Sequence, residues 1–193
     1  MVARTVRLLL LAAAVILIGG CATAPSRFYT LDSIAASDGA PAANYTVLVG
    51  PVAIPASVDR PEIVVQTAPY RVEIDEFNRW ASPLNDSIAR VIASDLGQLL
   101  GTPDVGLAPL ALNPSYRVTI DVQRFESIPG QSATVDALWA VRQTASGNVR
   151  SGRTVAHEAA QGPGYEALAA AHSRALATVS GDIAAAIRAS ASR

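Results

Sequence analysis

The chain has 193 residues, of which 50% are hydrophobic and 16% charged, and its formal net charge is −1. All fifteen basic residues are arginines, which excludes a P-loop with its phosphate-binding lysine and any Schiff-base enzyme. A single cysteine excludes an internal disulfide. One cysteine and two histidines are also too few for the three or four nitrogen and sulfur ligands of a usual zinc site. The scattered arginines and near-neutral charge also argue against nucleic-acid binding.

The first twenty residues have the features of a bacterial lipoprotein signal peptide. Arg4 and Arg7 precede an apolar stretch from Leu8 to Ile18, which is too short to cross a bilayer. The segment Leu17-Ile18-Gly19-Gly20-Cys21 resembles a lipobox, in which the thiol is acylated and the chain is cut before the cysteine. We therefore expect a signal peptide at 1–20 and lipid attachment at Cys21; a plain buried thiol, or the end of an anchor helix, is the alternative.

A lipidated Cys21 would hold the mature protein at a membrane. Two or three acyl chains anchor a protein for practical purposes, whereas one chain binds only marginally. Residues 21–27 then form a tether, and the six residues after Cys21 reach at most ~20 Å at about 3.3–3.6 Å each. Ala22, rather than an aspartate, favours the outer membrane. Loss of two signal-peptide arginines leaves a mildly acidic periplasmic domain at 28–193.

The first half of this domain is predicted to form strands. Residues 26–34 indicate a first strand, followed by a small polar loop at 35–41. Residues 45–54 are rich in β-branched side chains, and Gly50-Pro51 predicts an edge or a bulge there. Residues 61–67 and 70–74 are typical of a hairpin. In its second strand, alternation predicts a buried face with Tyr70, Val72 and Ile74 and a solvated face with Arg71, Glu73 and Asp75.

Hydrophobic spacing then changes to the helical period. Apolar residues recur from Trp80 to Leu100 at intervals of three, four and one, with Ser82 as the expected N-cap and Pro83 at the first helical position. After a loop, residues 115–125, 133–141 and 149–160 predict a three-stranded antiparallel meander. A long final helix is expected from Tyr165 to Ile187, and its alanine-rich face could be solvated or packed against another surface.

These elements predict one α+β domain. Several strands alternate and each helix has one apolar stripe, so we expect a mostly antiparallel sheet covered on one face by two amphipathic helices. The strand order cannot be deduced from the sequence.

The residues offer little support for catalysis. No serine lies in a G-x-S-x-G elbow that could pair with His157 or His172, so both histidines are interpreted as structural. Glu73, Asp75 and Glu76 are better explained as the solvated side of a strand than as a glycosidase carboxylate pair. We expect no enzyme activity, no metal and no cofactor other than the covalent lipid on Cys21.

Two short segments are candidates for partner binding. Asp59-Arg60-Pro61 and Arg79-Trp80 each couple an arginine to a rigid or aromatic neighbour, a combination enriched in recognition surfaces. A structural role is the favoured alternative, with Asp59 and Arg60 holding a loop together and Trp80 packing under the first helix.

Four motifs resemble the ABC-type transport auxiliary lipoproteins, a family that includes the PqiC-like intermembrane transport lipoproteins. The resemblance covers the whole mature chain, with its motifs concentrated before residue 85. At Glu62 and Ser82 the sequence departs from the family pattern, which more often has glutamine and an acidic residue. The motifs are Phe28-Tyr29-Thr30-Leu31, Val49-Gly50-Pro51-Val52-Ala53-Ile54-Pro55, Asp59-Arg60-Pro61-Glu62-Ile63-Val64 and Arg79-Trp80-Ala81-Ser82-Pro83-Leu84.

The resemblance implies a non-catalytic docking subunit, anchored in the outer membrane on its periplasmic side. Its implied partners are an MCE-domain protein and an ABC permease of an inner-membrane complex that transports lipids, and homo-oligomers are also implied. Two alternatives remain from the residues alone: a stand-alone structural or lipoprotein-assembly factor of the envelope, and an envelope hydrolase.

Overall fold

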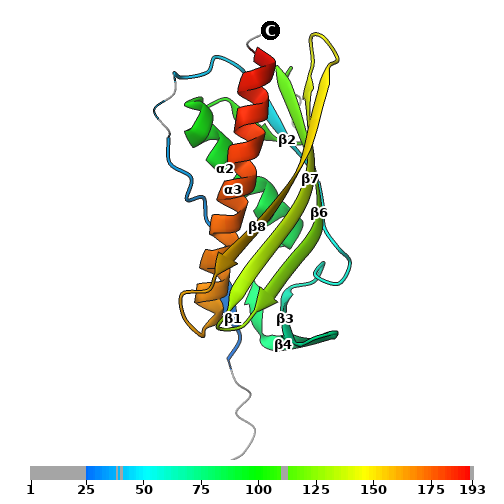
Figure 1. Cartoon of the computed structure of the whole chain (residues 1–193), viewed down its shortest axis with the longest axis vertical. Helices are drawn as coiled ribbons and strands as arrows, with labels where there is room; N and C mark the ends of the chain where they lie inside the picture. Colours follow the sequence, from blue (N-terminus) through cyan, green and yellow to red (C-terminus); the bar gives the residue numbers. More distant parts are fainter. Residues whose placement is uncertain (1–24, 38, 40, 110–112, 192–193) are drawn as a thin grey trace, which may run out of the picture.

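The structure is a computed structural model that describes residues 25–37, 39, 41–109 and 113–191. The predicted signal peptide and Cys21 lie outside the described residues. The described chain forms a single α+β domain with two helices, as predicted, but its strands form two sheets rather than the single sheet expected (Figure 1). Its elements are β1 (Arg27–Tyr29), β2 (Val47–Ala53), β3 (Glu62–Ala68), β4 (Arg71–Trp80), α2 (Leu84–Leu100), β5 (Val105–Leu107), β6 (Tyr116–Ile128), β7 (Ser132–Gln143), β8 (Val149–Ala159) and α3 (Tyr165–Ala191).

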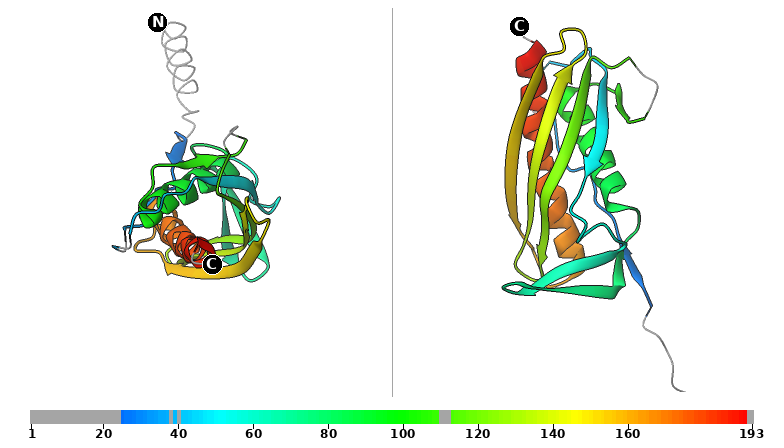
Figure 2. Two further views of the ribbon diagram at one scale, coloured as in Figure 1. Left: turned by 90° about the horizontal axis from the view of Figure 1, so that it is seen from above. Right: turned by 90° about the vertical axis from the view of Figure 1, so that its right-hand side faces the viewer.

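The larger sheet has five strands in the order β5-β2-β6-β7-β8. Strands β6, β7 and β8 form the predicted antiparallel meander. Strand β2 pairs in parallel with both β5 and β6, so the sheet is mixed. Seen from above, this curved sheet wraps around the two helices (Figure 2). The three-residue strand β5 was missed by the sequence prediction because a segment this short shows no alternation.

Strand β2 contains the predicted bulge. The register with β6 shifts between Val49 and Val52, at Gly50-Pro51. Gly50 has a φ of 112°, in a region that side-chain-bearing residues rarely adopt. Proline has no amide hydrogen to donate to a neighbouring strand; Pro51 lies at the bulge in the pairing with β6 and beyond Val47–Val49, the residues that pair with β5.

The smaller sheet has the order β1-β4-β3 and lies crosswise at the lower end of the molecule (Figures 1 and 2). The predicted hairpin is confirmed, since β3 and β4 pair antiparallel. The first strand is shorter than predicted, because only Arg27–Tyr29 pairs, in parallel with β4. Further along, the chain is held by the buried carboxylate of Asp95, which accepts hydrogen bonds from the Ser33 hydroxyl (2.6 Å) and the Ala35 amide (3.2 Å).

The predicted start of the first helix is one residue early, and Trp80, whose spacing matched the helical pattern, is not part of the helix. Trp80 is the last residue of β4, because it pairs with Tyr29 of β1 and its amide donates to the carbonyl of Pro61 at 2.7 Å. Helix α2 begins at Leu84 with Pro83 as N-cap and no side-chain cap, so Ser82 does not have the predicted role. The predicted end is confirmed, since Gly101 closes the helix with a φ of 64°.

The predicted faces of β4 are also wrong. Val72 and Ile74 are 59% and 47% exposed. Their cross-strand partners on β3 are Gln66 and Val64, whereas the buried Ile63 and Val65 pair with Asp75 and Glu73. Directly paired residues point to the same side of a sheet. On this side of the hairpin β3 contributes the buried Ile63 and Val65, and β4 contributes the half-buried Asp75 and the exposed Glu73.

The core lies between the large sheet and the helices. The apolar stripes of α2 and α3 are buried against the inner face of the sheet, as predicted. The alanines of α3 divide between the two roles considered, since Ala171 and Ala175 are buried while Ala170 and Ala185 are exposed. Within the described residues, no helix is both long and apolar enough to span a membrane.

Candidate functional site

The small sheet brings three of the four sequence motifs together. Pairing of β3 with β4 places Glu62 opposite Arg79, and pairing of β1 with β4 places Tyr29 opposite Trp80. Two backbone hydrogen bonds join the motifs directly, from Trp80 to Pro61 (2.7 Å) and from Ala81 to Tyr29 (2.9 Å). The fourth motif, around Gly50-Pro51, lies on β2 in the other sheet.

The loop between β2 and β3 presents three of the candidate partner-binding residues. Val58 is buried, and its amide donates to the Pro55 carbonyl at 3.0 Å, which fixes the base of the loop. The Arg60 amide then donates to the Val58 carbonyl at 2.9 Å. Asp59, Arg60 and Pro61 are all exposed on this compact loop. Because its backbone is already ordered, the loop can meet a partner with little further loss of conformational entropy.

Arg79 has a different role from its neighbours in the motif. Its guanidinium forms an ion pair with the Glu62 carboxylate across the hairpin, and its side chain is 36% exposed. A backbone hydrogen bond, followed by the Arg79 guanidinium, lowers the pKa of Glu62. This pair connects β3 to β4 directly beside the exposed loop at Asp59–Pro61.

Trp80 is part of the core. Its side chain is only 6% exposed. The indole meets the rings of Phe125 and His172 edge-on, with centroids 6.0 Å and 6.3 Å away. Of the two roles considered for Trp80, packing is the one the structure shows.

Ser127 and His172 form a pair that sequence reasoning missed. The Ser127 hydroxyl lies 2.8 Å from Nε2 of His172, although 45 residues separate them. His172 is fully buried, and burial lowers its pKa to about 3. A general base works best with a pKa near the ambient pH, so this imidazole is a poor one. Its Nδ1 has no hydrogen-bond partner among the described residues, which leaves the orienting carboxylate of a triad unfilled there.

The second histidine lies elsewhere. His157 is exposed on β8, and its Nδ1 lies 2.9 Å from the hydroxyl of Thr134 on β7. Each histidine thus has a hydroxyl neighbour, and the fold does not bring the two together. Within the described part of the chain, no group of three or more histidine, cysteine or acidic residues is placed to hold a metal.

Asp75 of β4 has a structural role. Asp75 accepts hydrogen bonds from the Tyr165 hydroxyl (2.8 Å) and the Asn78 side chain (2.9 Å). Burial alone would raise the pKa of Asp75, but these bonds, with those from the Phe77 and Asn78 amides, lower it. Burial and then the bond to Asp75 raise the pKa of Tyr165. The carboxylate therefore joins the hairpin to the start of α3.

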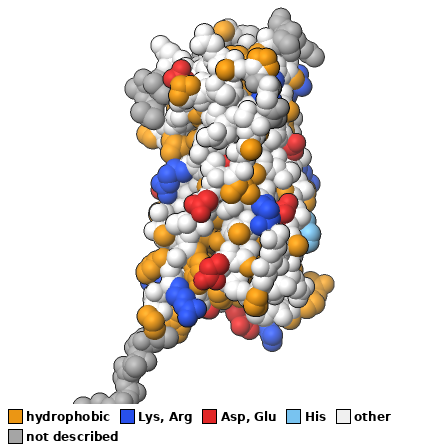
Figure 3. Space-filling view, turned by 90° about the vertical axis from the view of Figure 1, so that its left-hand side faces the viewer, with side chains coloured by type: hydrophobic (Ala, Val, Ile, Leu, Met, Phe, Trp, Pro, Cys, Tyr) orange, Lys and Arg blue, Asp and Glu red, His pale blue; other side chains and the backbone are white. Residues whose placement is uncertain are grey.

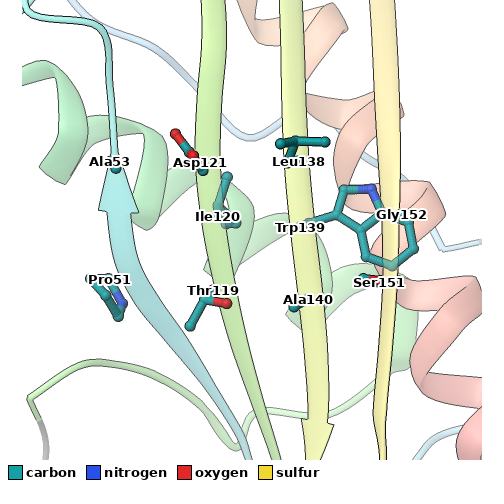
Figure 4. A pocket seen from close by; sticks show the side chains of 10 residues that line it. All are labelled: Pro51, Ala53, Thr119, Ile120, Asp121, Leu138, Trp139, Ala140, Ser151 and Gly152. Atoms are coloured by element: carbon teal, nitrogen blue, oxygen red, sulfur yellow. The ribbon is translucent and has the colours of Figure 1, made fainter.

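A shallow groove of about 520 Å³ lies on the outer face of the large sheet (Figure 4). Pro51 from the β2 motif lies at one side of it, and Leu138 of β7 is 42% exposed. The groove is mostly apolar and open, which suits a second contact surface better than an enclosed ligand site. Its lining residues are Pro51, Ala53, Thr119, Ile120, Asp121, Leu138, Trp139, Ala140, Ser151 and Gly152.

Comparison with solved structures shows the same fold in other proteins. An uncharacterized protein is similar with a TM-score of 0.70 and 20% identity, over 85% of this chain and 99% of that chain. A protein of Xanthomonas campestris, assigned to the family DUF330, is similar with a TM-score of 0.67 and 21% identity, over 81% of this chain and 92% of that chain. A comparison with curated proteins finds no match.

The family itself is shown by the sequence. The model of the ABC-type transport auxiliary lipoprotein component matches residues 29–184, which includes every strand after β1 and most of α3. The chain therefore belongs to the ABC-type transport auxiliary lipoprotein family.

Proposed function

We propose that this protein is a lipid-anchored periplasmic subunit that docks, without catalysing a reaction, onto an inner-membrane complex of an ABC permease and an MCE-domain protein. In this role it is PqiC-like and serves lipid transport between the two membranes. The single observation that carries the proposal is the family match over residues 29–184, because the family is that of an auxiliary lipoprotein component.

The anchor in this proposal is Cys21. The lipobox-like segment before it supports acylation, and Ala22 favours sorting to the outer membrane. The short tether supports a domain that stays close to the bilayer, since six residues reach at most ~20 Å.

The docking surface in this proposal is the exposed loop at Asp59, Arg60 and Pro61, together with the neighbouring ion pair of Arg79 and Glu62. Exposure, an ordered backbone and the presence of an arginine support this choice. Trp80 supports the surface from below through its buried packing. Homo-oligomers are part of the proposal and would present several copies of the loop.

Photo-cross-linking in the protein's own host tests the docking role. A photoreactive amino acid replaces Arg60, and a matched control replaces Ala145 in the exposed turn between β7 and β8. The proposal predicts a cross-link from position 60 to an MCE-domain protein or an ABC permease, identified by mass spectrometry, and none of these from position 145. Equal products from both positions, or cross-links only to unrelated envelope proteins, would refute it.

Charge reversal gives a second readout. Arg60→Glu should reduce the yield of co-purified complex several-fold, whereas Arg150→Glu, on the exposed surface of β8, should leave it unchanged.

A further inference from the structure

Exposed apolar side chains gather on the small sheet. Phe28 of β1 is 63% exposed, Val72 and Ile74 of β4 are 59% and 47% exposed, and Tyr70 in the turn between β3 and β4 is fully exposed. These four residues are called the apolar rim below. Figure 3 shows hydrophobic side chains at the lower end of the molecule, the end at which β1 lies in Figure 1, with acidic and basic side chains among them. Apolar groups gathered at one end of a domain mark a contact surface.

Tyr70 adds an independent observation. Its φ is 63°, in the left-handed region that a non-glycine residue rarely adopts and that is strained for a bulky side chain. Glycine or asparagine would fill this turn position without that strain. Strain of this kind clusters at functional sites, and here it keeps an aromatic side chain fully in solvent at the tip of a hairpin.

The rim cannot turn inward, because the small sheet is fixed to the body of the domain. The Tyr165 hydroxyl at the start of α3 donates to Asp75 at 2.8 Å, and within the small sheet the Tyr29 hydroxyl donates to Asn78 at 2.6 Å, which ties β1 to β4. The rings of Tyr29 and Tyr165 also pack together, with centroids 5.8 Å apart. The exposure of Val72 and Ile74 is therefore a property of the folded domain.

The predicted anchor lies next to the rim. Strand β1 begins at Arg27, six residues after Cys21, and the chain leaves the domain from the same end (Figures 1 and 2). Those six residues reach at most ~20 Å, so acyl chains on Cys21 would bring the bilayer to this end of the domain. The hairpin lies crosswise at this end, in the orientation that lets its length meet a flat surface.

We propose that the apolar rim rests in the headgroup region of the bilayer that holds the anchor, and so keeps the long axis of the domain upright on the membrane. This inference rests on the lipidation of Cys21 in the proposed function. Tyrosine suits such an interface because its hydroxyl tolerates water and its ring prefers hydrocarbon, and phenylalanine adds apolar surface that the bilayer can bury. Arg71, Glu73 and Glu76 are all exposed on the strand that carries Val72 and Ile74, so charges of both signs lie near the rim and attraction to anionic lipid is not the driving force.

The test places a fluorescent label on the rim of the full-length lipidated protein. Because acylation consumes the only native thiol, Val72→Cys and Ile74→Cys each introduce a single free thiol, and Ala145→Cys at the far turn is the matched control. The labelled proteins are reconstituted in phosphatidylcholine vesicles with a nitroxide quencher attached near the headgroup. Quenching at positions 72 and 74 should be several-fold stronger than at 145, and it should not change when sodium chloride is raised.

The outcomes separate this inference from its premise. Weak and equal quenching at all three positions, with one label per protein and flotation with the vesicles, would overturn the rim contact while leaving the anchor intact. Two labels per protein, or failure to float, would show that Cys21 carries no lipid and would overturn both.

Discussion

The imidazole of His172 lies flat against the ring of Phe125, with the ring centroids 3.8 Å apart and the planes 5° from parallel. Trp80 closes this cluster from the small sheet, while Phe125 comes from β6 and His172 from α3. The three rings therefore join both sheets to the last helix. His172 therefore contributes to packing between the sheets and α3.

Replacing His172 should test that role. His172→Ala removes the stacked ring and leaves the buried Ser127 hydroxyl without its partner, so we expect a loss of about 2–4 kcal/mol in the free energy of unfolding. His157→Ala, at the exposed histidine, should cost below about 1 kcal/mol. Urea denaturation followed by circular dichroism measures both, and equal losses would contradict the account.

The same histidine predicts a pH dependence. The pKa of His172 is about 3 in the folded protein and ~6.5 in an unfolded chain, so only the unfolded state binds a proton between these values. Stability should therefore be full above about pH 6.5 and fall as the pH is lowered towards 3, by at most about 1.4 kcal/mol per unit from this group. His172→Phe should flatten the profile between about pH 6.5 and 5.5, where carboxylates with ordinary pKa values of about 3.9 to 4.3 are almost fully ionised. An unchanged slope would show that His172 is accessible to protons.

Asp95 should be needed to hold the segment after β1. Its fully buried carboxylate accepts bonds from Ser33, from the Ala35 amide and, at 3.0 Å, from the Ser180 hydroxyl. Asp95→Ala removes the acceptor of the Ser33 hydroxyl and the Ala35 amide, while Ser180 can still donate to the Leu176 carbonyl (2.9 Å), and we expect a loss of about 1–3 kcal/mol. Hydrogen exchange at Ala35 should accelerate more than the global loss accounts for. If the Ala35 amide of the Asp95→Ala variant were as protected from exchange as in the wild type, Asp95 would not be what holds this segment.

Two glycine substitutions should have opposite signs. A Cβ on Gly152 would lie 2.3 Å from the Trp139 ring, whose Nε1 is held at 2.9 Å by Thr154, so Gly152→Ala should cost about 1–3 kcal/mol. Gly181→Ala, in α3 with open space around the new methyl group, should stabilise the protein by up to about 1 kcal/mol. Thermal unfolding compares the two, and a stabilising Gly152→Ala would mean that Trp139 is free to move.

Cys21→Ala should release the protein from the membrane. Without the thiol there is no site for the acyl chains, so the variant should appear in the soluble periplasmic fraction or as an unprocessed precursor. Its circular dichroism should match that of the wild type. Normal retention in the washed outer-membrane fraction would refute the assignment of Cys21 as the anchor.

Local patterns in the sequence predicted the helices, the hairpin and the meander. Helix α3 and strands β6 to β8 are long, so their periodicity is unambiguous. The errors concern non-local pairing. Trp80 matches the helical spacing of the residues after it, and only its contacts with Tyr29 and Pro61 place it in a strand.

At the candidate site, too, local patterns were predictable and non-local pairing was not. The sequence singled out Asp59, Arg60 and Arg79, and the fold brings them to one end of the hairpin. It could not indicate that Val72 and Ile74 are exposed, because alternation identifies two faces without saying which one meets the core. The register of β3 decides that question, since Ile63 and Val65 supply the buried side. The pairing of Ser127 with His172 likewise depends on a contact between β6 and α3.

The measurement that tests the central claim most directly is the identification of what the native protein binds. The tagged, lipidated protein would be lightly cross-linked in its own host, gently solubilised and purified, with cross-linking verified on a known envelope complex. The account predicts co-purification of an ABC permease or an MCE-domain protein, lost on Arg60→Glu. Recovery of the protein alone would contradict its role as a docking subunit. So would recovery of partners whose yield is the same with Arg60→Glu.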